Sequence, residues 1–392
     1  MIEKIKRISK EILPEIIRIR RHLHQHPELS FKEFNTSLFI QEELAKLNIP
    51  FTTGHVNTGI IGTIEGNNPK SKTILLRADI DALPIEEKNE IAYCSSNKGV
   101  MHACGHDAHT ASLIGAATIL NQLKNEFSGT IKLLFQPAEE QLPGGAKLLI
   151  DEGALDKINP NFCLAQHVFP ELPAGKVGFK KGTYMASADE LHVTVHGKGG
   201  HAALPHKLID PILITAQLIT NLQQIISRNN NPLTPSVLSF GFLEAKGATN
   251  VIPNSVKIKG TFRTFDEKWR VSAHNKMKKM ASSIAESMGG SCDFEIKKGY
   301  PYLINDDYFT EHAIDAAKEY LGEENVVDLD LRMTSEDFSY LSHLFPSCFY
   351  RLGTNNKNIN SNLHTPTFNI DESALEIGAG LFCFIAIKEL SK

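Results

Sequence analysis

The sequence predicts an α/β protein of two domains, in which a mixed, helix-covered sheet forms the larger domain and an α+β unit is inserted into it. The chain has 392 residues, more than one simple core normally accommodates. Short apolar strands alternate with helices near both ends of the chain, which is typical of a sheet covered on both faces. After Gly182 the pattern changes to strands with period-two alternation, which is typical of half-exposed strands.

The first part of the chain supplies most of the larger domain. Apolar residues spaced three or four apart predict a helix from Ile2 to about His24, and His26-Pro27 ends it. Further helices are expected near 36–47, 110–123 and 146–152, and buried strands near 60–64, 73–78, 129–136 and 162–167.

The inserted unit is expected to span residues 183–293. Strands are predicted near 190–197, 237–243, 255–263 and 292–296, and helices near 211–226 and 267–288. From about Tyr300 the α/β pattern resumes, and it ends in a helix near 374–390. We therefore predict one domain of residues 1–182 and 294–392, and a second of residues 183–293.

Composition excludes several classes of protein. The net charge is −4, so the chain lacks the excess of basic residues that is typical of nucleic-acid-binding proteins. No stretch approaches the ~20 apolar residues of a membrane span, and residues 1–21 do not resemble a signal peptide. The six cysteines are scattered without CxxC pairs, which indicates reduced thiols and a cytoplasmic location.

The stretch from Met101 to His109 concentrates metal-binding side chains: Met101-His102-Ala103-Cys104-Gly105-His106-Asp107-Ala108-His109. A thiol and imidazoles so close together can point at one place, and a transition metal is the usual occupant. Alone, this stretch is compatible with a structural zinc knuckle as well as with a catalytic site.

Other potential ligands follow predicted strands. Asp79 and Asp81 come after the strand at 73–78, Glu139 and Glu140 after the strand near 129–136, and His167 ends the strand at 162–167. Sheets of this class gather ligands at the carboxyl ends of their strands. A separate His364 lies in Asn362-Leu363-His364-Thr365-Pro366. Of two adjacent glutamates, one can bind a metal ion while the other acts as a general base.

Taken together, these motifs resemble the M20 metallopeptidase family, in its amidohydrolase branch. The resemblance runs in order over nearly the whole chain and includes Arg20–Leu29, Arg77–Pro84, Met101–His109, Phe135–Glu140, Gly197–Ala202, Ala248–Asn254 and His364–Phe368. No departure occurs at a position that carries chemistry.

The resemblance implies specific roles. Cys104, His106, Glu140, His167 and His364 would hold two divalent metal ions per subunit, of a type (Mn, Zn, Co or Ni) that the sequence does not choose. Glu139 would be the general base. The inserted unit resembles the family's lid or dimerisation domain, whose His201 would stabilise the oxyanion, acting in its own subunit or in its partner's. Asn250 and Arg263 match positions that contact substrate.

The expected activity is hydrolysis of the amide bond of N-acyl amino acids by metal-activated water, in a homodimeric enzyme. Two other classes stay open: a dipeptidase or carboxypeptidase of the same family, and a binding protein with a remnant metal site. Among single residues, His22, His24 and His26 form a rival histidine cluster that we interpret as structural. We expect Asp79, Asp81, His102 and His109 to support the ligands, and Asp337 either to contribute to the site or to cap a helix.

Overall fold

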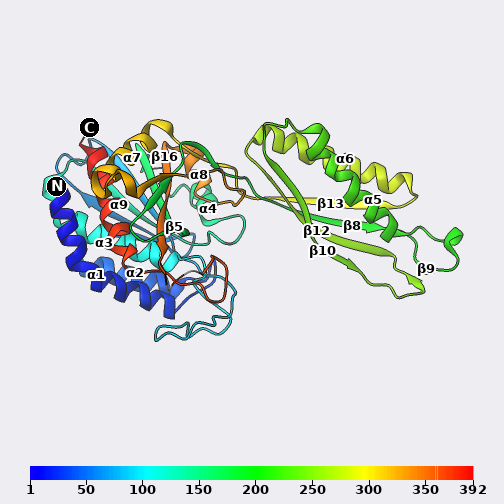
Figure 1. The fold of residues 1–392 in the computed structure, drawn as a ribbon, viewed down its shortest axis with the longest axis horizontal. Coiled ribbons are helices and arrows are strands. Elements are labelled where there is room, and N and C mark those ends of the chain that lie inside the picture. Colours follow the sequence, from blue (N-terminus) through cyan, green and yellow to red (C-terminus); the bar gives the residue numbers. More distant parts are fainter. Residues whose placement is uncertain (157, 358, 360, 392) are drawn as a thin grey trace. The chain divides into compact units, whose positions relative to one another are not determined.

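The computed structural model describes residues 1–156, 158–357, 359 and 361–391. These fall into two compact units (Figure 1). The first comprises residues 1–184, 304–330 and 337–392, and the second comprises residues 185–303 and 331–336. The second unit extends about ten residues beyond the predicted boundary at 293, because residues 291–298 form one unbroken strand paired within it.

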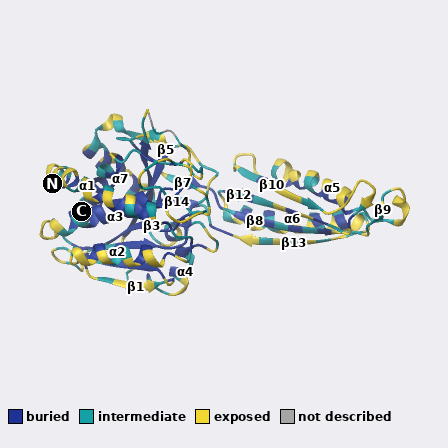
Figure 2. Ribbon diagram, turned by 90° about the horizontal axis from the view of Figure 1, so that it is seen from below, coloured by how far each residue is buried: buried dark blue, intermediate teal, exposed yellow. Residues whose placement is uncertain are grey.

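An eight-stranded mixed sheet forms the centre of the first unit, with the strand order β1-β2-β4-β3-β5-β16-β6-β15. Its strands are β1 (Phe51–His55), β2 (Gly59–Glu65), β3 (Thr73–Asp79), β4 (Thr130–Gln136), β5 (Phe162–Pro173), β6 (Val177–Phe179), β15 (Val326–Asp328) and β16 (Ser347–Asn355). The central strands β4, β3, β5 and β16 run parallel to one another. They are almost wholly buried (Figure 2), as their apolar runs predict.

Helices cover this sheet. They are α1 (Ile2–Gln25), α2 (Phe34–Lys46), α3 (His106–Gln122), α4 (Gly145–Asp151), α7 (Asp307–Leu321), α8 (Ser339–Leu344) and α9 (Ala374–Leu390). α3 is buried along nearly its whole length between α1 and α9. Gly115 permits this close packing, since a Cβ there would lie 2.6 Å from Ile16 and 2.8 Å from Ala379. α3 is thereby held firmly, and its first residue, His106, is fixed in place.

The parallel strands bring their carboxyl ends to one edge of the sheet. Asp79 at the end of β3 lies opposite Gln136 at the end of β4. On the other side, His167 of β5 lies opposite Arg351 of β16. The loops that follow β3 and β4 therefore emerge side by side, next to His167.

The second unit contains a four-stranded antiparallel sheet, β10-β12-β8-β13, and two long helices. Its elements are β8 (Asp189–His196), α5 (Pro211–Gln224) with a π-helical turn at Ile225–Asn229, β10 (Ser236–Ala245), β12 (Ser255–Thr264), α6 (Glu267–Ser287) and β13 (Ser291–Lys298). A hydrophobic core of its own lies between sheet and helices. The prediction of an α+β unit is confirmed.

Two short ribbons complete the fold. β9 (Gly200–His201) pairs with β11 (Val251–Ile252), and β7 (Gly182–Met185) pairs with β14 (Leu303–Asn305). No helix in the described ranges is both long and apolar enough to cross a membrane.

Candidate metal centre

Five side chains from distant parts of the first unit converge on one point at this sheet edge. Cys104 Sγ lies 3.4 Å from His167 Nε2 and 3.3 Å from His364 Nε2. His364 Nε2 in turn lies 3.3 Å from Glu140 Oε1. Cys104, His106 and His167 form one group with donor atoms within 4.8 Å of one another, and Cys104, Glu140 and His364 form a second. Together the two groups offer enough donor atoms for two metal ions.

The backbone around these residues is specialised. Gly105 has φ +86°, and a Cβ there would lie 2.4 Å from a methyl carbon of Val168. The chain can therefore turn between Cys104 and His106 only because residue 105 has no side chain. His364 also has a positive φ, +60°, and its N–H donates a hydrogen bond to Ala103 O at 2.8 Å.

Hydrogen bonds to the outer nitrogens fix the orientation of two imidazoles. His106 Nδ1 lies 3.1 Å from Asp81 Oδ1, and His167 Nδ1 donates to Val168 O at 2.7 Å. Each ring therefore directs Nε2 toward the cluster, as metal-binding histidines do. His106 Nε2 is buried and has no hydrogen-bond partner among the described residues, which fits an atom that binds a metal ion.

The electrostatics of the cluster favour a cation. Burial lowers the pKa of His106, but the charges of Asp79 and Asp81 outweigh it and raise this pKa to about 10. Burial, with the charges of Glu140 and Glu139, raises the pKa of the Cys104 thiol well above its ordinary value. A bound divalent ion would favour the deprotonated forms of both residues, because it would displace the imidazolium proton of His106 and stabilise the thiolate of Cys104.

Glu139 lies beside the cluster, and neighbouring residues hold its carboxylate in place. Its side chain is buried, and its carboxylate comes within 4.8 Å of His106 and Glu140. Glu139 Oε1 accepts a hydrogen bond of 3.4 Å from the Asp337 N–H. The Asp337 carboxylate is itself held by Arg77 (2.7 Å), Gln136 (2.8 Å) and the Ala146 N–H (2.9 Å). Asp337 therefore fixes the loops around Glu139 and contributes to the site, as one of the two predictions for it stated.

The other polar residues of the motifs lie around the ligands. His109 Nδ1 lies 2.6 Å from Asp79 Oδ1, and His109 Nε2 accepts the Val168 N–H at 2.9 Å. Both ring nitrogens are thus occupied, which leaves His109 no lone pair for a metal ion. His102 is buried, and its ring nitrogens have no hydrogen-bond partner within the described ranges.

Comparison with known proteins fits this geometry. The model of peptidase family M20/M25/M40 matches residues 75–388. The chain belongs to this family. It is accordingly a hydrolase of the M20 family, and the resemblance seen in the motifs is confirmed.

Individual M20 relatives match over nearly the full chain. The protein is 38% identical over 398 residues to thermostable carboxypeptidase 2 of Saccharolobus solfataricus, with 100% of both chains covered. It is 41% identical over 376 residues to N-acetyl-L-cysteine deacetylase of Bacillus subtilis, covering 96% of this chain and 88% of the relative. A solved Bacillus subtilis structure, described as a dinuclear metal-binding peptidase of the M20 family, is 35% identical with a TM-score of 0.83 and covers 97% and 99% of the two chains.

Three predicted site residues of this M20 hydrolase lie in its second unit. His201 is exposed on β9, where it pairs with Val251 of β11. Asn250 is exposed, and its carbonyl accepts the Ala202 N–H at 3.0 Å. Arg263 on β12 donates to Thr261 Oγ1 (3.0 Å) and Ser335 Oγ (2.9 Å).

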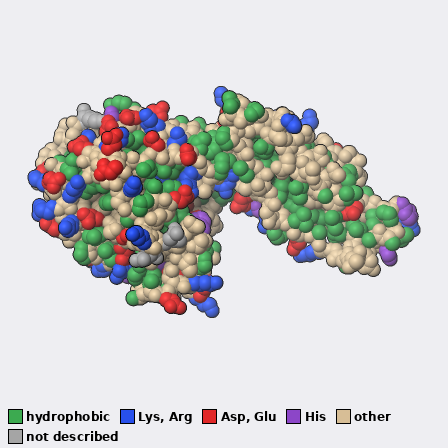
Figure 3. Space-filling view, in the orientation of Figure 1, with side chains coloured by type: hydrophobic (Ala, Val, Ile, Leu, Met, Phe, Trp, Pro, Cys, Tyr) green, Lys and Arg blue, Asp and Glu red, His purple; other side chains and the backbone are tan. Residues whose placement is uncertain are grey.

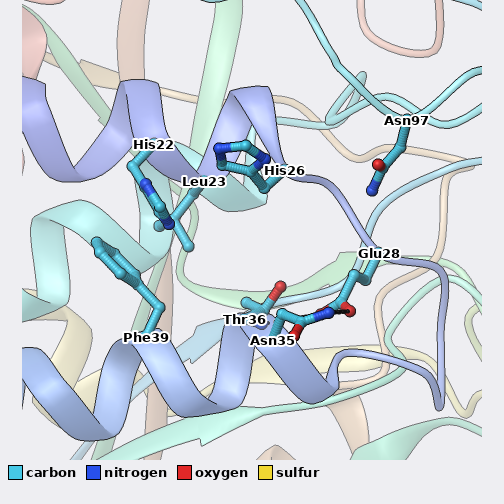
Figure 4. Close-up of a pocket in the computed structure, with 8 residues that line it drawn as sticks. All are labelled: His22, Leu23, His26, Glu28, Asn35, Thr36, Phe39 and Asn97. Carbon is cyan, nitrogen blue, oxygen red and sulfur yellow. Dashed lines mark hydrogen bonds between the residues drawn. The ribbon is translucent and has the colours of Figure 1, made fainter.

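The rival histidine cluster does not assemble as a three-histidine site. His24 is buried, with Nδ1 2.8 Å from Asp107 and Nε2 3.0 Å from Glu87. His22 and His26 line a separate cavity of about 300 Å³ between α1 and α2 (Figure 4). The His22 ring stacks on Phe39 with 4.0 Å between ring centroids. These contacts support the structural interpretation.

Sequence reasoning did not identify two buried residues beside the cluster. Arg351 donates to Tyr184 Oη at 2.9 Å. Burial lowers the pKa of His167 and the charge of Arg351 lowers it further, which favours the neutral ring that a metal ligand needs. Glu33 accepts a hydrogen bond from the Ala138 N–H, in the loop that carries Glu139 and Glu140. Both contacts join distant segments, and no local motif marks them.

Proposed function

We propose that this protein is a metal-dependent amidohydrolase that cleaves N-acyl amino acids to a carboxylic acid and a free amino acid. The observation that carries the proposal is the pair of donor groups sharing Cys104, with the buried carboxylate of Glu139 beside them. A relative 41% identical over nearly the full chain, named N-acetyl-L-cysteine deacetylase, supports this substrate class.

In this proposal Cys104, His106 and His167 would hold one divalent ion, and Cys104, Glu140 and His364 would hold the other. Such ions lower the pKa of a water molecule and polarise the carbonyl under attack. Thiolate, imidazole and carboxylate donors suit Mn, Zn, Co and Ni, so the donor set does not select among them.

The protein's own residues would manage the proton. Glu139 accepts a proton from the attacking water and passes it to the nitrogen of the leaving amine. The Asp337 N–H keeps the Glu139 carboxylate oriented during this transfer. His201 donates a hydrogen bond to the oxyanion, and Asn250 and Arg263 bind the substrate.

The two adjacent glutamates offer a matched test. Glu139→Gln should lose at least about 100-fold in kcat while both metal ions stay bound, because only the base is removed. Glu140→Gln should instead lose metal, because it removes a ligand. Activity on N-acetyl and hippuryl amino acids and elemental analysis provide the two readouts. Near-normal activity of Glu139→Gln would refute its assignment as the base.

A peptidase activity is the second candidate, favoured by the 38% identity to a protein named thermostable carboxypeptidase. A panel of N-acetyl, hippuryl and indole-acyl amino acids together with dipeptides, assayed with Mn, Zn or Co, separates the two. Preference for acylated substrates by kcat/KM supports the amidohydrolase, and preference for dipeptides supports the peptidase.

We also propose a homodimer formed through the second unit, which would serve as lid and dimerisation domain. Figure 3 shows hydrophobic side chains at the surface of this unit. Its exposed apolar side chains include Leu204, Ile212, Leu213, Phe242, Leu243 and Val251. A cytoplasmic location is proposed because all six cysteines are free.

A further inference from the structure

The loop that carries the two glutamates begins with an unfavourable backbone conformation. Ala138 is fully buried and has φ +54°, a left-handed conformation that residues with a Cβ rarely adopt. Such a conformation persists only where surrounding contacts hold it. Ala138 directly precedes Glu139, so the contacts that hold it also determine where the Glu139 side chain points.

Glu33 supplies one of these contacts from far away in the sequence. Its Oε1 accepts the Ala138 N–H at 2.9 Å and the Phe31 N–H at 2.9 Å. Its Oε2 accepts the Thr58 hydroxyl at 2.9 Å. On the far side of Glu139, the Glu140 N–H donates to Asp81 Oδ2, also at 2.9 Å. Buried carboxylates therefore hold both backbone N–H groups that flank the proposed base.

The usual reason for a glutamate at this place does not explain Glu33. It is the N-cap residue of α2, where a side-chain oxygen often accepts a backbone N–H of the first turn, but its side chain makes no such hydrogen bond to α2. Glu33 is also fully buried, and burial together with the charge of Asp81 raises its pKa to about 7. A carboxyl group kept in so unfavourable a setting indicates a role beyond starting a helix.

We propose that Glu33 is a positioning residue that holds Ala138 in its left-handed conformation and so orients Glu139 toward the cluster. This inference rests on the proposed function, in which Glu139 is the base. Glu33 acts through the backbone and touches neither substrate nor metal. Protonation does not abolish the contact, since Oε1 remains an acceptor and the Thr58 hydroxyl can either donate or accept.

The test compares Glu33→Ala, Glu33→Gln and the control Thr58→Val. Glu33→Ala removes the acceptor for Ala138, so kcat should fall about tenfold or more with KM and bound metal unchanged. Glu33→Gln keeps an acceptor oxygen and should retain most of the activity. Thr58→Val removes a different hydrogen bond to the same carboxylate and should match the wild type in kcat.

Hydrogen exchange gives a readout independent of activity. Amide exchange in the 137–140 segment should be faster in Glu33→Ala than in wild type, Glu33→Gln or Thr58→Val. Replacing Ala138 by glycine in the Glu33→Ala protein should recover part of kcat, because glycine adopts a left-handed conformation unaided. If Glu33→Ala does not fold, Glu33→Asp takes its place, since it keeps the carboxylate but is one methylene shorter.

The inference is overturned if Glu33→Ala has wild-type kcat and exchange, or if its loss of activity is fully explained by lost metal. Failure of the proposed function looks different. In that case the wild type would hydrolyse no acylated amino acid or dipeptide, while the exchange comparison would still show whether Glu33 holds Ala138.

Discussion

Asp81 is a buried carboxylate that makes hydrogen bonds to two of the proposed metal ligands. Its Oδ1 lies against His106 Nδ1, and its Oδ2 accepts from the Ser30 hydroxyl (2.6 Å) and the Glu140 N–H. It thus orients one proposed ligand through its ring and another through its backbone. The sequence analysis predicted that Asp81 supports the ligands, and its hydrogen bonds to His106 and to the Glu140 backbone agree with that prediction.

Glu33 and Arg351 could not be predicted in the same way. Glu33 lies just before the helix expected near 36–47, and no motif of the sequence analysis includes it. Its contact with Ala138 spans 105 residues and depends on the fold. The five proposed ligands were easier to identify, since they lie in motifs that resemble those of the M20 family.

The shared position of Cys104 predicts an unequal effect of ligand substitutions. Because Cys104 belongs to both donor groups and His364 to one, Cys104→Ala should lose more metal than His364→Ala. Elemental analysis of the two purified variants, alongside wild type, measures this directly. Equal losses would show that the thiol does not serve both ions.

The raised pKa of Glu33 also predicts that the free energy of unfolding depends on pH. Its pKa of about 7 lies above the ordinary 4.5, so between these values the folded protein retains a proton that the unfolded chain has released. Wild-type stability should therefore fall as pH rises from 4.5 to 7, relative to Glu33→Gln, by up to about 3 kcal/mol. Urea unfolding of both metal-loaded proteins across this range gives the difference. A difference that does not change with pH would contradict the raised pKa.

At the level of elements, buried strands were easier to predict from the sequence than exposed or very short ones. β3, β4 and β5 are continuous apolar runs and were predicted near their observed positions. β1 is an edge strand with three exposed residues, and β6 and β15 have three residues each, so none carries a recognisable pattern. Helix α3 starts at His106, earlier than predicted, because its first turn is built from the motif itself.

The requirement for glycine between Cys104 and α3 can be tested by replacing two glycines of similar backbone conformation. Gly105 (φ +86°) faces Val168, whereas Gly54 (φ +83°) has no atom within 4 Å of an added Cβ. Gly54→Ala should cost about 1 kcal/mol from backbone strain alone. Gly105→Ala should cost about 1–3 kcal/mol more and should reduce bound metal, because Val168 must move and its carbonyl orients His167. Urea unfolding and elemental analysis measure both effects, and equal costs for the two variants would contradict this account.

At the level of the whole molecule, the protein consists of two units with separate hydrophobic cores. The proposed metal ligands and Glu139 lie in the first unit, and His201 lies in the second. The active site proposed above therefore includes residues of both units. In the proposed homodimer, the second unit that completes a site can come from the same subunit or from its partner.

Mixing two inactive variants distinguishes these arrangements. In a heterodimer of Glu139→Gln and His201→Ala subunits, action across the dimer gives one site with both defects and one site with neither. Random assortment should then restore about a quarter of wild-type activity, since half of the dimers are mixed and half of their sites are intact. Each variant alone is the control, and native mass spectrometry verifies that mixed dimers form. If mixed dimers form without recovered activity, His201 serves the site of its own subunit.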